Sequence, residues 1–108
     1  MRQFTSIQII VGIEESKEGE TMAPTFVSDR LNQIRTYLAN EIGGYTEQDS
    51  YGGWINPSQP NVLVQEKGKV FTLITNTPCK LYEWAGVVRD LLHQNSVVVI
   101  YADKAEFI

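Results

Sequence analysis

The sequence predicts an α+β fold of the ferredoxin-like kind: a split β-α-β two-layer sandwich whose antiparallel sheet carries two helices on one face. Strand-like and helix-like segments follow one another in the order strand, helix, strand, strand, helix, strand. Both helical segments repeat apolar residues every three or four positions, as helices with one buried face do. A short polar turn joins the two middle strands, which makes them antiparallel neighbours.

The first strand is expected in SIQIIVGI, residues 6–13, which is short and rich in isoleucine and valine. Such a run is typical of a central strand, and its alternation puts one set of side chains on the same face: Ile7, Ile9, Val11 and Ile13. The polar, acidic run EESKEGETMAPT that follows shows no periodicity and contains Gly19 and Pro24. We therefore expect a long mobile loop there.

The first helix is expected from Thr25 or Ser28 to Ile42. Its apolar stripe has spacings of four, three and four, and consists of Val27, Leu31, Ile34 and Leu38. Gly43 and Gly44 should end the helix, because glycine adopts the left-handed conformation without a Cβ penalty.

The two middle strands are less regular. Residues 45–55 are expected to form a polar strand that is broken or bulged at Gly52-Gly53. After the turn NPSQP, a second strand begins at Val62 and resumes at Val70, with Lys67-Gly68 as a bulge or tight turn.

The second helix should begin near Thr77 and Pro78 and run to about Gln94. One of its faces is apolar: Leu81, Trp84, Ala85, Val88, Leu91 and Leu92. The last strand, SVVVIYA, is continuously apolar, so we expect it to be central or buried on both sides. With both helices on one face, the other sheet face is left open for a second subunit, a ligand or a partner.

Composition limits the possible functions. The 108 residues suit a single domain spanning 1–108, and a net charge of −4 without a basic cluster argues against binding extended nucleic acid. One cysteine excludes an intrachain disulfide, and no run is apolar and long enough for a membrane span. The sequence therefore predicts a cytoplasmic protein.

No catalytic constellation is recognisable. Cys79 lies at the start of the second helix, where its thiolate would be favoured, but its reactivity stays open. His93 is roughly 20 Å away by helical rise, too far to act as its base. No histidine, cysteine or carboxylate recurs at metal-ligand spacing, and no phosphate-binding glycine motif is present. We therefore expect no catalytic residue, no metal and no cofactor.

A candidate contact surface lies in the polar strand. Its flat aromatic rings with polar ends are suited to stacking on a base or anchoring a partner. If the strand alternates, four side chains share a face, and the glycine bulge could bring the fifth round to join them: Tyr45, Glu47, Asp49, Tyr51 and Trp54. The alternative is structural, since aromatic cross-strand pairs also stabilise sheets.

Three stretches, VGIEESKEGE, GGYTEQDSYGGWINPS and the final AEFI, resemble small phage-encoded proteins of one α/β domain. This resemblance implies a phage origin and a host-cytoplasm setting, where such proteins inhibit host enzymes or sequester nucleotide signals. It transfers no catalytic residue.

The leading hypothesis is a non-enzymatic counter-defence protein, a homo-oligomer that sequesters a nucleotide-like small molecule between subunits or inhibits a host protein. One alternative is a small cofactor-independent α/β-barrel dimeric enzyme with a tyrosine, His93 or a buried carboxylate as proton carrier. An apolar cavity holding a perturbed acid would favour that enzyme. A third possibility is an interaction module that meets a basic partner through its acidic surface.

Overall fold

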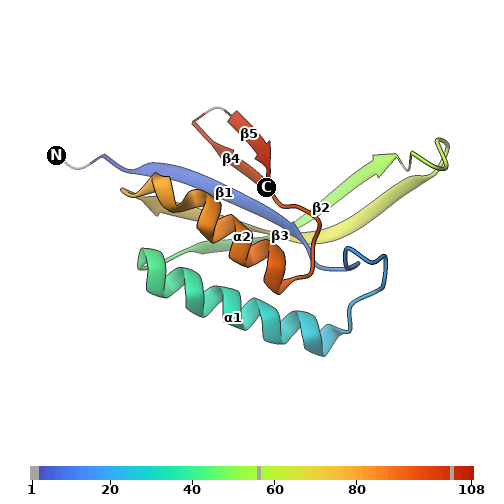
Figure 1. Ribbon diagram of the computed structural model, residues 1–108, viewed down its shortest axis with the longest axis horizontal. Helices are drawn as coiled ribbons and strands as arrows, with labels where there is room; N and C mark the ends of the chain where they lie inside the picture. The colour runs from blue at the N-terminus through green and yellow to red at the C-terminus, as the bar shows by residue number, and fades with distance from the viewer. Residues whose placement is uncertain (1–2, 56, 103) are drawn as a thin grey trace.

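The structure is a computed structural model that describes residues 3–55, 57–102 and 104–108. Within these ranges, five strands form one antiparallel sheet in the order β2-β3-β1-β4-β5. Two helices lie side by side on one of its faces (Figure 1). The α+β class is confirmed. The elements are β1 (Thr5–Gly12), α1 (Pro24–Ile42), β2 (Thr46–Ile55), β3 (Leu63–Thr75), the 3-10 turn η1 (Pro78–Lys80), α2 (Leu81–Leu91), β4 (Val98–Tyr101) and β5 (Lys104–Phe107).

The core lies between the helices and alternate residues of the strands. On β1 the predicted face is buried at Ile7, Ile9 and Val11, because successive strand side chains point to opposite faces of the sheet. Neighbouring strands and the helices supply the rest of this cluster: Val27, Leu31, Ile34, Leu38, Phe71, Leu73, Leu81, Trp84, Ala85, Val88, Leu92, Val97 and Val99. Burial of each large side chain stabilises the fold by about 1.5–3 kcal/mol.

The helix ends follow local backbone chemistry. Pro24 opens α1, where its missing N–H group costs nothing, and Gly43 ends the helix at φ 95° with its N–H bonded to the Ala39 carbonyl at 2.8 Å. The second helix stops at Leu91, earlier than the expected Gln94, and His93 takes a left-handed φ of 48°. This reversal turns the chain toward β4.

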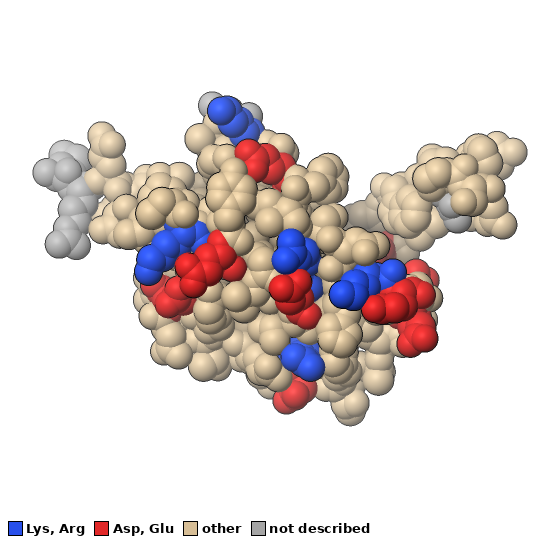
Figure 2. All heavy atoms as spheres, viewed as in Figure 1, with Lys and Arg blue, Asp and Glu red and all other residues tan. Residues whose placement is uncertain are grey.

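The prediction that the two middle strands are interrupted by bulges or turns is wrong. The ladder between β2 and β3 is continuous from Thr46 to Ile55, so Gly52 and Gly53 stay in register and Lys67-Gly68 forms neither bulge nor turn. Beyond Gly12, the last residue of β1 in the ladder, β2 and β3 continue as a two-stranded arm, for which the structure describes residues 52–55 and 57–66. The arm projects from the body (Figure 1), and in Figure 2 it shows no charged side chain at its outer end.

The expected last strand corresponds to β4, which lies inside the sheet between β1 and β5. It is not buried on both sides, because Ile100 is 37% exposed on the face away from the helices. The sheet continues into β5, which the sequence did not indicate because its four residues carry no strong apolar alternation. The hydroxyls of Tyr82 and Tyr101 donate to the two carboxylate oxygens of Glu106, at 2.9 and 3.0 Å, and so tie β5 to α2.

The acidic run after β1, expected as a long loop, contains a hydrogen-bonded turn with one bridge between Glu15 and Thr21. We call residues 14–22 the acidic hairpin. The N–H of Ser16 donates to the Glu20 carbonyl and that of Met22 to the Glu14 carbonyl, each at 2.8 Å. Gly19 sits at the tip with a φ of 79°, a conformation that favours glycine. Among the described residues, no helix is long and apolar enough to cross a membrane.

Candidate functional site

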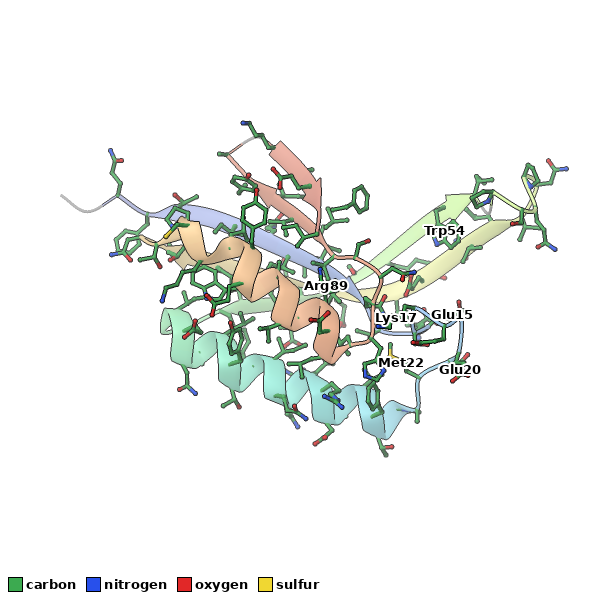
Figure 3. All side chains as sticks on the ribbon, viewed as in Figure 1. Glu15, Lys17, Glu20, Met22, Trp54 and Arg89 are labelled. Carbon is green, nitrogen blue, oxygen red and sulfur yellow. The ribbon has the colours of Figure 1, made fainter. Side chains whose placement is uncertain are left out.

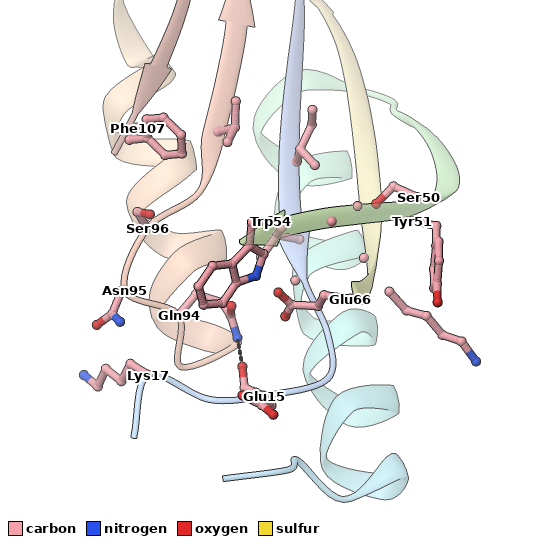
Figure 4. Close-up of a pocket in the computed structure, with 18 of the residues that line it drawn as sticks. Glu15, Lys17, Ser50, Tyr51, Trp54, Glu66, Gln94, Asn95, Ser96 and Phe107 are labelled. Carbon is pink, nitrogen blue, oxygen red and sulfur yellow. Dashed lines mark hydrogen bonds between the residues drawn. The ribbon is translucent and has the colours of Figure 1, made fainter. Parts of the chain in front are cut away.

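A cavity of about 860 Å³ lies on the open face of the sheet, opposite the helices (Figure 4). Its floor contains Ile10, Val70 and Val98, which are cross-strand partners on β1, β3 and β4 and alternate with the buried core residues. Its walls come from the arm, the acidic hairpin, residues 94–96 after α2, and Phe107 of β5. The volume lies within the range of small-molecule sites.

Two glycines lie in the cavity floor where β1, β3 and β2 are neighbours. Gly12 and Gly68 are cross-strand partners, and Gly68 also faces Ser50. A Cβ atom on Gly68 would lie 2.5 Å from the Val11 carbonyl oxygen, so no larger residue fits without moving the backbone. Gly68 is buried, so β1, β2 and β3 pack closely at this point of the floor.

Glu66 supplies the charge of this floor. It pairs with Gly52 across the ladder, and its Oε1 atom would lie 2.3 Å from a Cβ placed on Gly12. Partial burial raises the pKa of the Glu66 carboxyl, and the nearby charges of Glu14 and Glu15 raise it further, although the backbone N–H groups of these two residues oppose the rise. A cation bound next to this carboxyl group would favour its ionised form.

Trp54 lines the cavity from the arm, and Phe107 lines it from β5. Trp54 is 49% exposed and Phe107 79% exposed, so both rings are available to a ligand. In Figure 3 Trp54 stands on the arm, while Glu15 and Lys17 belong to the neighbouring acidic hairpin. The cavity thus combines aromatic surface with charges of both signs.

Three of the predicted contact residues have other partners. Tyr45 packs edge-on against Phe71, with ring centroids 6.1 Å apart. Glu47 accepts two hydrogen bonds from Arg35 of α1, at 2.7 and 2.8 Å, and the Arg35 bond lowers the pKa of the Glu47 carboxyl. Asp49 pairs with Lys69 at 2.5 Å. These contacts stabilise the helix-facing side of β2, and a binding role for the three residues stays a prediction.

Tyr51 and Trp54 both border the cavity, but their side chains leave opposite faces of β2. Tyr51 shares the face of Asp49, and its hydroxyl donates to Gln65 at 3.2 Å. Trp54 is on the open face with Ser50 and Gly52. The expectation that a bulge brings Trp54 round to join the others is wrong, because the strand has no bulge.

Neither Glu66 nor Gln94 is among the residues predicted from the sequence. For Glu66 a signal exists: in an uninterrupted β3 it shares a face with Gly68 and Val70, an acid among small and apolar residues. The expected bulge at Lys67-Gly68 hid this alternation. For Gln94 we find no signal, because its side chain bonds to a residue 79 positions away.

Cys79 and His93 take no part in the cavity. Cys79 is exposed in η1, at the start of the second helix, whereas His93 follows the end of α2. The His93 ring lies 5.0 Å from the Phe26 ring at the beginning of α1. Across the described ranges, no group of three histidine, cysteine or acidic side chains is arranged to hold a metal ion.

The fold is shared with a phage enzyme. No family model and no curated protein matches the sequence. Among solved structures, the chain is similar to a phage SAM lyase in complex with S-methyl-5'-thioadenosine, at 16% identity and a TM-score of 0.68, covering 97% of this chain and 88% of the lyase. It is also similar to a phage SAM lyase in the apo state, at 18% identity and a TM-score of 0.65, covering 97% and 87%.

These findings confirm the resemblance to small phage-encoded proteins. They also correct the leading hypothesis, because the similar structures are enzymes and not passive binding proteins. A cavity containing an acid of perturbed pKa is the expected mark of the enzyme alternative, and Glu66 is such an acid. The sheet of that alternative is nevertheless open here and forms no barrel.

Proposed function

We propose that this protein is an enzyme that cleaves S-adenosylmethionine and releases S-methyl-5'-thioadenosine. One observation carries the proposal: the fold that is similar to a phage SAM lyase has a cavity combining an exposed tryptophan with a partly buried carboxylate. The substrate has the matching parts, a flat adenine ring and a cationic amino-acid end.

The cavity offers a partner for each part of this substrate. Trp54 provides a face on which adenine stacks, an interaction worth about 1–3 kcal/mol per base. Glu66 attracts the sulfonium and ammonium charges, which favour its ionised form. Lys17 of the acidic hairpin lines the same cavity and suits the substrate carboxylate.

The reaction makes few chemical demands on the protein. When the bond between the sulfonium sulfur and the amino-acid chain breaks, sulfur keeps the electron pair and leaves as a neutral thioether, so no proton donor is needed. The carboxylate of the same molecule can attack the carbon that sulfur leaves and close a five-membered ring. A reaction between two groups held in one molecule needs positioning above all. This chemistry suits a chain without a cysteine-histidine pair in its cavity.

The proposal also includes a ferredoxin-like topology, a homo-oligomer and a role in counter-defence. The order β2-β3-β1-β4 with antiparallel neighbours supports a ferredoxin-like arrangement, which β5 extends. Exposed apolar side chains on the open face and the arm, among them Ile74, Leu63 and Phe107, support a homo-oligomer. Destruction of a methyl donor in the host cytoplasm would act as counter-defence, because methyltransferases there would lose their substrate.

The test is to incubate the purified protein with S-adenosylmethionine and follow the products by liquid chromatography and mass spectrometry. We expect stoichiometric release of S-methyl-5'-thioadenosine above a protein-free control, with the second product at the mass of a ring-closed four-carbon fragment. Glu66→Gln should abolish the release, whereas Glu83→Gln, an exposed carboxylate on α2, should not. Intact S-adenosylmethionine after prolonged incubation with folded protein would overturn the proposal.

A further inference from the structure

The acidic hairpin is fastened to the end of α2 by two hydrogen bonds. The backbone N–H of Lys17 donates to the His93 carbonyl at 2.7 Å, and the side-chain Nε2 of Gln94 donates to the Glu15 carbonyl at 2.7 Å. The same Nε2 also donates to the Leu92 carbonyl at 2.9 Å. The Gln94 side chain therefore connects the hairpin with the last turn of the helix (Figure 4).

The orientation of the Gln94 amide follows from its partners. Both neighbours of Nε2 are carbonyl oxygens, which only accept, so the NH₂ group must face them. The Oε1 atom then faces the floor of the cavity, 3.0 Å from the Cβ position of Gly12. The carboxylate of Glu66 approaches the same position, at 2.3 Å. Gln94 and Glu66 thus meet over Gly12.

The hairpin also creates the surroundings of Glu66. The backbone N–H groups of Glu14 and Glu15 lie near the Glu66 carboxylate and lower its pKa, whereas the negative charges of the two side chains raise it. The Glu14 carboxylate accepts a hydrogen bond from the backbone N–H of Lys67, next to Glu66 on β3. Lys17 lines the same cavity from the hairpin. Movement of the hairpin would therefore change the burial of Glu66 and the charges around it.

We infer that Gln94 is a positioning residue, which acts through Glu66 by holding the acidic hairpin over the cavity floor. One donated hydrogen bond holds the Glu15 carbonyl, and the other anchors the same amide to the Leu92 carbonyl. The hairpin held in this way places its Glu14 carboxylate on the N–H of Lys67, next to Glu66. The expected effect on turnover rests on the proposed function, whereas the effect on the hairpin and on Glu66 does not.

The test compares Gln94→Met, which keeps the length of the side chain and removes both donors, with Gln33→Met on the exposed side of α1 as matched control. Amide hydrogen exchange should become about tenfold faster in residues 15–22 of Gln94→Met and stay unchanged in the control. A carbon NMR titration should show the pKa of Glu66 falling toward the ordinary range, because burial and the neighbouring carboxylates no longer raise it. Gln94→Lys, which restores a donor, should recover slow exchange.

Turnover gives a further readout. If ionised Glu66 binds the cationic substrate, kcat/KM rises with pH through the pKa of Glu66, and in Gln94→Met this rise should move to lower pH. KM should increase about tenfold while kcat changes less. Wild-type exchange and an unshifted Glu66 titration in folded Gln94→Met would overturn the inference. An inactive wild-type protein would defeat the proposed function alone, because exchange and titration would still decide the role of Gln94.

Discussion

The two faces of the sheet are built from the same strands and follow opposite rules. On the helix-covered face of β1, Ile7 and Ile9 are fully buried against large apolar side chains. On the open face the alternate positions carry Ile10 and Gly12, and the latter lets the Glu66 carboxylate approach the backbone. One face carries the packing that stabilises the fold, and the other carries the accessible charge and aromatic surface.

The difference shows that the role of a residue in β2 depends on which face of the sheet its side chain leaves, and therefore on whether its number is odd or even. Odd-numbered residues leave the helix-facing side, where Glu47 bonds to Arg35, whereas even-numbered ones such as Trp54 leave the open side. In the part of β2 that lines the cavity, Tyr51 reaches the cavity border from the helix-facing side. Substitutions on the two faces should therefore have separable effects. Activity should depend on the open face, and the free energy of unfolding on the covered one.

The largest effect on activity is expected for Glu66→Gln. Loss of the charge should lower kcat/KM for S-adenosylmethionine at least about 100-fold, because electrostatic groups placed in a partly dry site have effects of this size. The free energy of unfolding should change little, since neutral glutamine is not repelled by Glu14 and Glu15. Steady-state kinetics and urea unfolding check both parts. Full activity in this variant would show that Glu66 has no role in the reaction.

Gly68→Ala should have the largest effect on stability. Its Cβ would lie 2.5 Å from the Val11 carbonyl oxygen and 2.7 Å from Ser50 Oγ, so β1 and β3 must separate. We expect a loss of about 2 kcal/mol in the free energy of unfolding. Gly52→Ala is the matched control on the arm, because no described atom lies within 4 Å of its Cβ position. Equal urea midpoints for the two variants would contradict the close approach at Gly68.

Trp54→Ala and Tyr51→Ala compare the two faces within one strand. Loss of the Trp54 ring should weaken binding of S-methyl-5'-thioadenosine about tenfold, corresponding to one stacked base. Tyr51→Ala should have a smaller effect, since its hydroxyl bonds to Gln65 on the other face. Isothermal titration calorimetry measures both. The reverse order would place the ligand on the helix-facing side of the arm.

The smallest effect is expected for Glu47→Gln. Arg35 lowers the pKa of the Glu47 carboxyl in the folded state, so this residue stabilises the protein above the pKa of the unfolded chain. The variant should lose up to about 1 kcal/mol at pH 7, as for partly exposed ion pairs. The difference from wild type should vanish as pH falls below about 4 and through the lowered folded pKa. Urea unfolding at several pH values measures it. A large loss of activity in this variant would instead indicate that Glu47 takes part in ligand binding.

Much of the fold is predictable from the sequence because it depends on local periodicity. The stripe containing Val27 and Leu38 identifies α1, and the glycine after Ile42 identifies its end. The cavity depends instead on the register between strands, which the misplaced bulge at Lys67-Gly68 obscured. Trp54 could be proposed as a contact residue from its type alone. Glu66 required the correct alternation of β3, and Gln94 required a contact between distant segments.

The arm gives the molecule a measurable shape. The Cα radius of gyration is 14.5 Å, whereas a compact chain of this length has about 13 Å. The principal extents of 51, 31 and 20 Å describe an elongated body whose long axis includes the arm (Figure 1). Small-angle X-ray scattering from a single chain should therefore show a pair-distance distribution with an extended tail. In a homo-oligomer whose arms lay along neighbouring copies, the tail would be shorter relative to the mass, so scattering tests the proposed assembly without a label.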